Sequence, residues 1–133
     1  MKLDRPVLFY DGECRFCRFM ARGIEMLDRR RRFGYMPFAD ELAPELLAPI
    51  QADKREHSIH LVFPDGEIVS AGEALAELSR VLPLGGLIAD AARSQRPVRE
   101  VFRWGYSLVA DRRGPLSSLV PDVRGPVRRP GTA

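Results

Sequence analysis

The chain has 133 residues, of which 45% are hydrophobic, and a formal net charge of +3. This length suits one domain with a buried core, and the composition excludes collagen-like and wholly disordered proteins. No apolar run approaches the roughly 20 residues needed to cross a bilayer. The N-terminus leads directly into a strand rather than into a signal peptide's apolar stretch, so we expect a cytoplasmic protein with no membrane partner.

The positive charge is only modest support for an anionic partner. The one tight cluster, residues 29–32, consists of four arginines at the expected end of a helix. Cations there complement the helix dipole and stay solvated. No basic segment with interleaved aromatic residues suggests a nucleic-acid groove. We therefore expect no nucleic-acid partner.

The first third of the chain predicts a β-α-β unit. Residues 6–10 form a short apolar run, typical of a strand buried on both faces. From residue 14 to about residue 30, apolar side chains recur at spacings of three and four, which predicts a helix with one core-facing side: Phe16, Met20, Ile24 and Leu27. Residues 33–38 are a second predicted strand, limited in length by Pro37. A right-handed crossover makes the two strands parallel.

The middle of the chain predicts a helix, a hairpin and another helix. The first helix is expected within residues 39–50. Strands at 58–63 and 67–69 flank Pro64-Asp65-Gly66, where proline presets one turn dihedral and glycine permits a positive φ. A helix to about residue 82 begins at Ser70, which we predict to form a capping box with Glu73. The expected order is thus β-α-β-α-β-β-α.

The rest of the chain is predicted to be helical and then irregular. Helices are expected over residues 84–94 and 97–110. After Asp111 the sequence is dominated by Gly, Pro, Arg and Ser, with too little apolar content to hold itself in place. We predict one domain over residues 1–113, including the helices from about residue 84, and a poorly ordered tail over residues 114–133.

Cys14 and Cys17 are the chain's only cysteines, and they lie where the first strand turns into a helix. Two intervening residues are the spacing of a reversible dithiol–disulfide pair. If Cys14 opens the helix, unpaired N–H groups and the positive end of the helix dipole favour its thiolate. Cys17, one turn on, lies on the same face and can resolve a mixed disulfide. Arg15 and Arg18 are candidate cations, whereas Glu13 opposes thiolate formation.

Asp11 has two possible roles beside the cysteines. Its carboxyl group can relay a proton to or from Cys17 if partial desolvation raises its pKa. It can also cap the helix by accepting hydrogen bonds from backbone N–H groups near Cys14. The two roles are compatible. No organic cofactor is expected, because the electrons reside in the cysteine pair.

Asp11, Cys14 and Cys17 form a D-x-x-C-x-x-C pattern. Together with the element order, this pattern resembles the thiol-disulfide oxidoreductase DCC family, which is named for its Asp-Cys-Cys motif. The resemblance covers roughly residues 6–113. It implies an α/β, thioredoxin-like fold with a central four-stranded mixed sheet and a C-terminal helical extension. It also implies thiol–disulfide exchange with a protein or low-molecular-weight thiol, with these three residues as the site.

One position departs from ordinary thioredoxins, which place a cis-proline just before the hairpin strand to dock substrate backbone. Aligning the two hairpins places Ser58 at that position. A non-proline cis bond costs about 2.5–4 kcal/mol, so we expect a trans peptide there. Peptide docking in the thioredoxin manner is therefore in doubt, while the dithiol chemistry is unaffected.

Two alternatives to redox chemistry follow from other residues. Cys14 and Cys17 could supply half of a tetrahedral zinc site, with His57 and His60 as the other half, although positions i and i+3 of a regular strand face opposite ways. The protein could also be a redox-inactive interaction module on a thioredoxin-like scaffold. The aromatic residues of the last helix would then form a contact face: Phe102, Trp104 and Tyr106. We expect them instead to pack that helix over the sheet.

Overall fold

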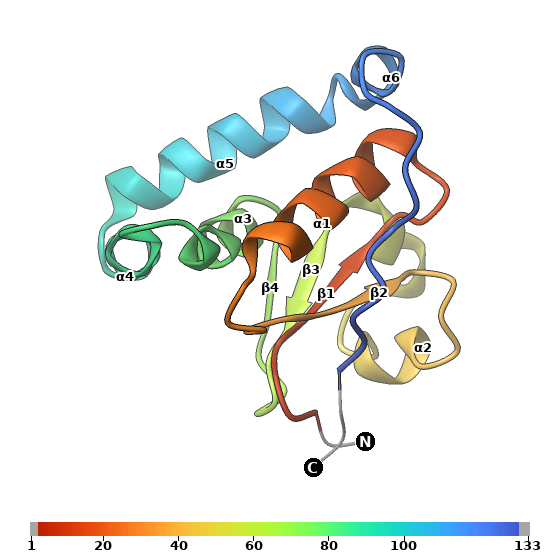
Figure 1. Cartoon of the computed structure of the whole chain (residues 1–133). Helices are drawn as coiled ribbons and strands as arrows, with labels where there is room; N and C mark the ends of the chain where they lie inside the picture. The colour runs from red at the N-terminus through yellow and green to blue at the C-terminus, as the bar shows by residue number, and fades with distance from the viewer. Residues whose placement is uncertain (1–2, 131–133) are drawn as a thin grey trace.

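The computed structural model describes residues 3–130 and is built on one four-stranded mixed sheet (Figure 1). The strand order is β2-β1-β3-β4. β1 pairs in parallel with β2 and antiparallel with β3, and β3 pairs antiparallel with β4. The strands are β1 (Val7–Tyr10), β2 (Gly34–Pro37), β3 (His60–Val62) and β4 (Ile68–Ser70). This order confirms the predicted thioredoxin-like α/β fold.

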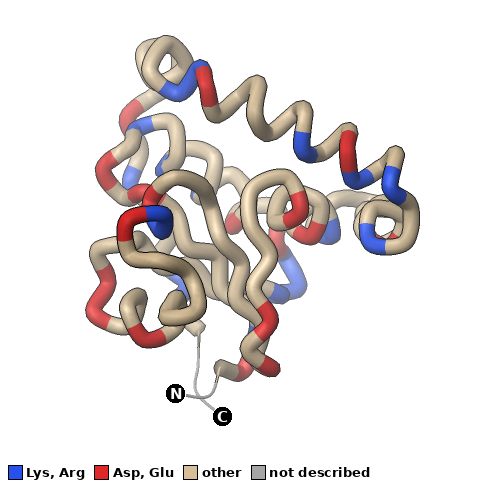
Figure 2. The backbone as a smooth tube through the Cα atoms, turned by 180° about the vertical axis from the view of Figure 1, so that it is seen from behind, with Lys and Arg blue, Asp and Glu red and all other residues tan. Residues whose placement is uncertain are grey.

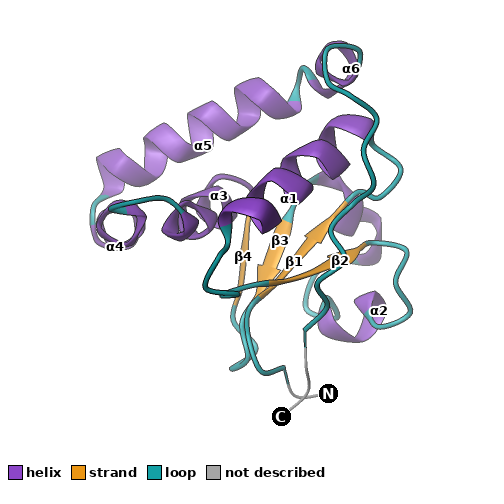
Figure 3. Cartoon of the chain, in the orientation of Figure 1, coloured by secondary structure: helices purple, strands orange, loops and turns teal. Residues whose placement is uncertain are grey.

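Helices cover both faces of the sheet (Figure 3). The α-helices are α1 (Arg15–Leu27), α2 (Ala43–Leu46), α3 (Ala71–Leu78), α4 (Gly85–Ser94), α5 (Arg96–Ala110) and α6 (Arg113–Ser117), and the 3₁₀ turns are η1 (Ala52–His57) and η2 (Ser79–Val81). α1 and α3 lie on one face and α2 on the other, while α5 packs against α3 and α4. The sequence patterns did not predict η1 or α6. No helix of the described residues is long and apolar enough to span a membrane.

β1 is buried on both faces, as its apolar run predicts. Successive side chains of a strand point to opposite faces, so β1 contributes to two separate clusters. Leu8 and Tyr10 belong to the larger cluster beneath α1 and α3. Val7 and Phe9 belong to the smaller cluster on the side of α2. The carboxyl end of this anchored strand leads directly into the turn that carries the cysteines.

The predicted capping box at the start of α3 is wrong. Ser70 occupies the N-cap position but makes no side-chain capping bond. Its Oγ lies 2.6 Å from Nδ1 of His60, on the neighbouring strand. Glu73 instead pairs with Arg103 of α5. Both side chains bind partners on other elements instead of the helix end, and a local motif cannot reveal such partners.

The face of α1 also differs from the predicted stripe. Leu27, expected in the core, is 53% exposed. Glu25, on the expected polar side, is 3% exposed, and its Oε2 accepts the backbone N–H groups of Val127 and Arg128. The polar side of α1 is therefore covered by a segment from the other end of the chain.

That C-terminal segment, residues 118–130, runs beside α1 and β2 (Figure 1). The Tyr35 N–H donates to the Arg128 carbonyl at 3.0 Å, and the Arg128 guanidinium lies 3.4 Å from the Asp28 carboxylate. The domain boundary near residue 113 and the poor order of the tail stay predictions. Residues 1–2 of the predicted domain and residues 131–133 of the predicted tail lie outside the described residues.

Charges of both signs are interspersed over the backbone as seen from behind (Figure 2). In this view basic positions are scattered over several helices and loops rather than gathered on one basic face. Several arginines are held by carboxylates, as where Arg80 and Arg93 both pair with the buried Glu77. Local ion pairs thus neutralise part of the positive charge of the arginines.

Candidate active site

The turn between β1 and α1 presents the two cysteines. Asp11 Oδ1 accepts the Glu13 N–H at 3.0 Å, and the Asp11 carbonyl accepts the Cys14 N–H at 3.3 Å. Glycine is required at position 12 because the backbone passes close to Pro37 at the end of β2. A Cβ on residue 12 would lie 2.9 Å from Cβ of Pro37. The turn therefore holds Cys14 at the N-cap of α1, as predicted.

Cys14 and Cys17 are both free thiols and lie together at the start of α1. Cys14 Sγ accepts the Cys17 backbone N–H at 3.3 Å, so the sulfur occupies the place of a capping oxygen. Cys14 is partly exposed, whereas Cys17 is only 4% exposed. One thiol can thus meet a partner while the other lies directly behind it.

The Cys17 thiol is strongly affected by its surroundings. Burial raises its pKa to about 12, and the neighbouring Cys14 thiol contributes in the same direction. Arg113 opposes this rise: its Nη1 lies 3.9 Å from Cys17 Sγ. At neutral pH the Cys17 thiol is therefore protonated in the reduced protein.

Arg113 is brought to the site by α6, which lies at the start of α1 (Figure 1). Ser117 Oγ joins the two helices, because it accepts the Phe16 N–H at 3.3 Å and donates to the Arg113 carbonyl at 2.8 Å. Sequence reasoning missed Arg113, since α6 contains Gly114 and Pro115 and has no apolar periodicity. The only available signal was the family resemblance, which extended to residue 113.

The two cations that the sequence suggested interact with other groups. The Arg18 guanidinium donates to the Gly12 carbonyl at 2.8 Å and pairs with Asp122 at 2.7 Å. It thereby ties the cysteine turn to the C-terminal segment. Arg15 Nε is buried without a hydrogen-bond partner among residues 3–130. In that part of the chain, neither guanidinium donates a hydrogen bond to a cysteine sulfur.

Ser58 has an extended backbone, with φ −155° and ψ 166°. Every peptide bond of the described chain is trans, as expected at this position. The next residue, Ile59, donates its N–H to the Tyr106 hydroxyl at 3.0 Å. The Tyr106 side chain of α5 therefore accepts the hydrogen bond of the backbone N–H immediately before β3.

The geometry gives the zinc alternative no support. Nδ1 of His60 lies 2.6 Å from Ser70 Oγ, and Nε2 lies 2.8 Å from the Arg55 carbonyl. Burial lowers the pKa of His60, so this internal imidazole is neutral. His57 is exposed. Within residues 3–130, no group of three or more His, Cys, Asp or Glu side chains could hold a metal ion.

The aromatic residues of α5 do not act as one packing group. Tyr106 is partly buried, and its hydroxyl binds the chain before β3. Trp104 is 68% exposed, so the expectation that it packs on the sheet is wrong. Its indole ring lies on the surface of the helix, where the contact-face alternative had placed it.

A protein-family model described as DCC1-like thiol-disulfide oxidoreductase matches residues 8–119. The matched region contains the sheet except for Val7, both cysteines and α6. Comparisons with curated proteins and with solved structures found no match.

Proposed function

The chain belongs to the DCC1-like thiol-disulfide oxidoreductase family, and from this premise we propose that it exchanges thiols and disulfides through Cys14 and Cys17. The observation that carries the proposal is the unequal exposure of two adjacent free thiols at one helix N-terminus. The partly exposed Cys14 suits attack on a partner, and the buried Cys17 suits its release. The partner is a protein or a low-molecular-weight thiol or disulfide.

The exchange proceeds through a mixed disulfide. The Cys14 thiolate attacks one sulfur of the partner's disulfide, and the other partner sulfur leaves as a thiolate that takes a proton from water. Cys17 then loses its proton and attacks Cys14 Sγ. The Cys14–Cys17 disulfide forms, the bond to the partner breaks, and the second partner sulfur leaves. Two electrons pass to the partner, and the reverse sequence oxidises a dithiol.

Trapping the mixed disulfide tests this function. Cys17→Ser should accumulate a one-to-one adduct on Cys14 when mixed with oxidised glutathione, because the resolving sulfur is missing. Intact mass spectrometry should show the adduct, and dithiothreitol should remove it. The Cys14→Ser protein is the matched control and should form no adduct under the same conditions. An unmodified Cys17→Ser protein would contradict the resolving role.

Asp11 is assigned a positioning role, because its side chain and carbonyl both hold the turn before Cys14. Asp11→Asn should keep the exchange rate within about twofold, since an amide oxygen can accept the same bond from Glu13. Asp11→Ala should slow exchange about fivefold, because loss of a turn hydrogen bond worth about 1 kcal/mol lets Cys14 leave its reactive position. The measurement is the rate of reaction with an aromatic disulfide from pH 6 to 9. If Asn slows exchange as much as Ala and shifts the pH profile, the carboxyl group transfers a proton and the positioning role is wrong.

A further inference from the structure

We propose that Arg113 is a catalytic residue of the resolving step, stabilising the Cys17 thiolate while it attacks the mixed disulfide on Cys14. The inference rests on the proposed function and extends it to the C-terminal helices. It assigns α6 a chemical purpose that its sequence does not suggest.

The contact joins residues 96 positions apart in the chain. Arg113 Nη1 lies 3.9 Å from Cys17 Sγ, within reach of a charge-assisted hydrogen bond to sulfur. Within the described residues, no ion pair links this guanidinium to a carboxylate, in contrast to Arg18 and Arg103. Its charge is therefore available to the sulfur rather than neutralised by an acid.

The resolving step needs such a charge. Cys17 must be deprotonated in order to attack, yet it is almost fully buried, and desolvation disfavours its thiolate. A guanidinium keeps its proton throughout the physiological pH range and is weakly hydrated, so it can remain charged in a partly buried place. Contact with it offsets part of the desolvation cost at the more buried of the two sulfurs.

The other titratable groups around Cys17 carry no competing negative charge at neutral pH. Cys14 lies on the same helix, and in the mixed disulfide its sulfur is uncharged. Tyr106 of α5 interacts with both Cys17 and Arg113, and burial raises the pKa of its phenol. The tyrosine is thus neutral under working conditions. Among residues 3–130, Arg113 is the charged side chain that acts on the Cys17 sulfur.

The position of the guanidinium is fixed by the rest of α6. Ser117 Oγ binds both the Phe16 N–H of α1 and the Arg113 carbonyl. This hydroxyl anchors the helix to the same end of α1 that carries the cysteines. In the step itself, Cys17 gives its proton to solvent and attacks Cys14 Sγ, and the departing partner sulfur takes the electron pair of the broken bond and then a proton.

A two-phase reaction with one equivalent of 5,5′-dithiobis(2-nitrobenzoate) tests the role. Attack by Cys14 releases the first thionitrobenzoate, and resolution by Cys17 releases the second. Arg113→Gln should leave the rate of the first phase within about twofold and slow the second phase about tenfold. The tenfold figure is the fall in the Cys17 thiolate fraction when its pKa rises by about one unit. Raising the pH by about one unit should restore the second phase. Arg113→Lys, which keeps the charge, should lie between Arg113→Gln and the unmodified protein.

Arg112→Gln is the matched control, because it removes an exposed neighbouring cation that binds the Leu108 carbonyl rather than a cysteine. Both of its phases should equal those of the unmodified protein. The role of Arg113 is overturned if Arg113→Gln resolves within about twofold of normal. It is also overturned if both phases slow together and neither lysine nor higher pH restores them. An unmodified protein that releases no second equivalent refutes the exchange function itself, and the role with it.

Discussion

Replacing Cys14 with serine is expected to lower the rate of thiol–disulfide exchange at least about a thousandfold. A serine hydroxyl is not ionised at neutral pH and does not attack disulfides. Cys17 cannot replace the lost nucleophile, because it is 4% exposed and its pKa is raised to about 12. The measurement is the rate of reduction of an aromatic disulfide by the reduced protein.

The fold should survive this substitution, which makes the result interpretable. Cys14 is the N-cap of α1, and its sulfur accepts the Cys17 N–H. Serine is among the preferred N-cap residues and can accept the same bond. The thermal unfolding midpoint of Cys14→Ser should therefore equal or exceed that of the unmodified protein. A stable Cys14→Ser protein that kept more than about a tenth of the rate would show that another group is the nucleophile.

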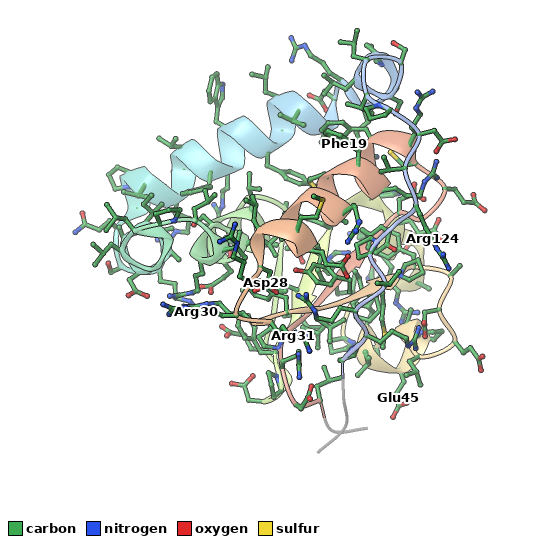
Figure 4. The ribbon with its side chains drawn as sticks, viewed as in Figure 1. Phe19, Asp28, Arg30, Arg31, Glu45 and Arg124 are labelled. Carbon is green, nitrogen blue, oxygen red and sulfur yellow. The ribbon has the colours of Figure 1, made fainter. Side chains whose placement is uncertain are left out.

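Replacing Asp28 with alanine is expected to destabilise the fold by about 3–5 kcal/mol, the cost of leaving several donors to a buried carboxylate unpaired. The side chain lies at the C-terminal end of α1 (Figure 4). It is 1% exposed. Its carboxylate accepts the N–H groups of Arg32 at 2.9 Å and Phe33 at 3.0 Å, and the Tyr35 hydroxyl at 3.1 Å. The Arg128 guanidinium completes the set at 3.4 Å. Alanine would leave three donors unpaired and one cation without its carboxylate.

Chemical denaturation of the reduced protein measures this effect. The free energy of unfolding should fall for Asp28→Ala, and Asp28→Asn should lie between it and the unmodified protein, because the amide keeps an acceptor. Asp111→Ala is the control, since that residue is exposed at the end of α5, and its change should stay within about 0.5 kcal/mol. A loss below about 1 kcal/mol for Asp28→Ala would mean that this network does not hold the end of α1.

The order of the central elements could be predicted because it depends on local patterns. The apolar run of β1 and the Pro64-Asp65-Gly66 turn each carry their own signal. What the sequence could not supply are contacts between distant segments. Glu25 resembles a solvated residue until residues 118–130 cover it, and Ser70 resembles a helix cap until His60 takes its hydroxyl.

The cysteine pair could be located for a similar reason. Its spacing, and its place between a strand and a helix, put Cys14 at a helix N-terminus without any long-range information. The cation beside the sulfur could not be found this way. Arg15 and Arg18 are near in sequence, but Arg18 turns towards Gly12 and Asp122. The guanidinium that meets Cys17 comes from a short helix near the other end of the chain, where sequence proximity carries no information.

The central claim is that Cys14 and Cys17 form a reversible redox pair. Its most direct test is a titration of the protein in thiol buffers of defined potential, with acid quenching, alkylation after unfolding so that the buried thiol is counted, and mass measurement. We expect one cooperative, reversible two-thiol step with a midpoint between about −120 and −270 mV. Two thiols that remain alkylatable in the most oxidising buffers would contradict the claim and leave the pair as packing residues.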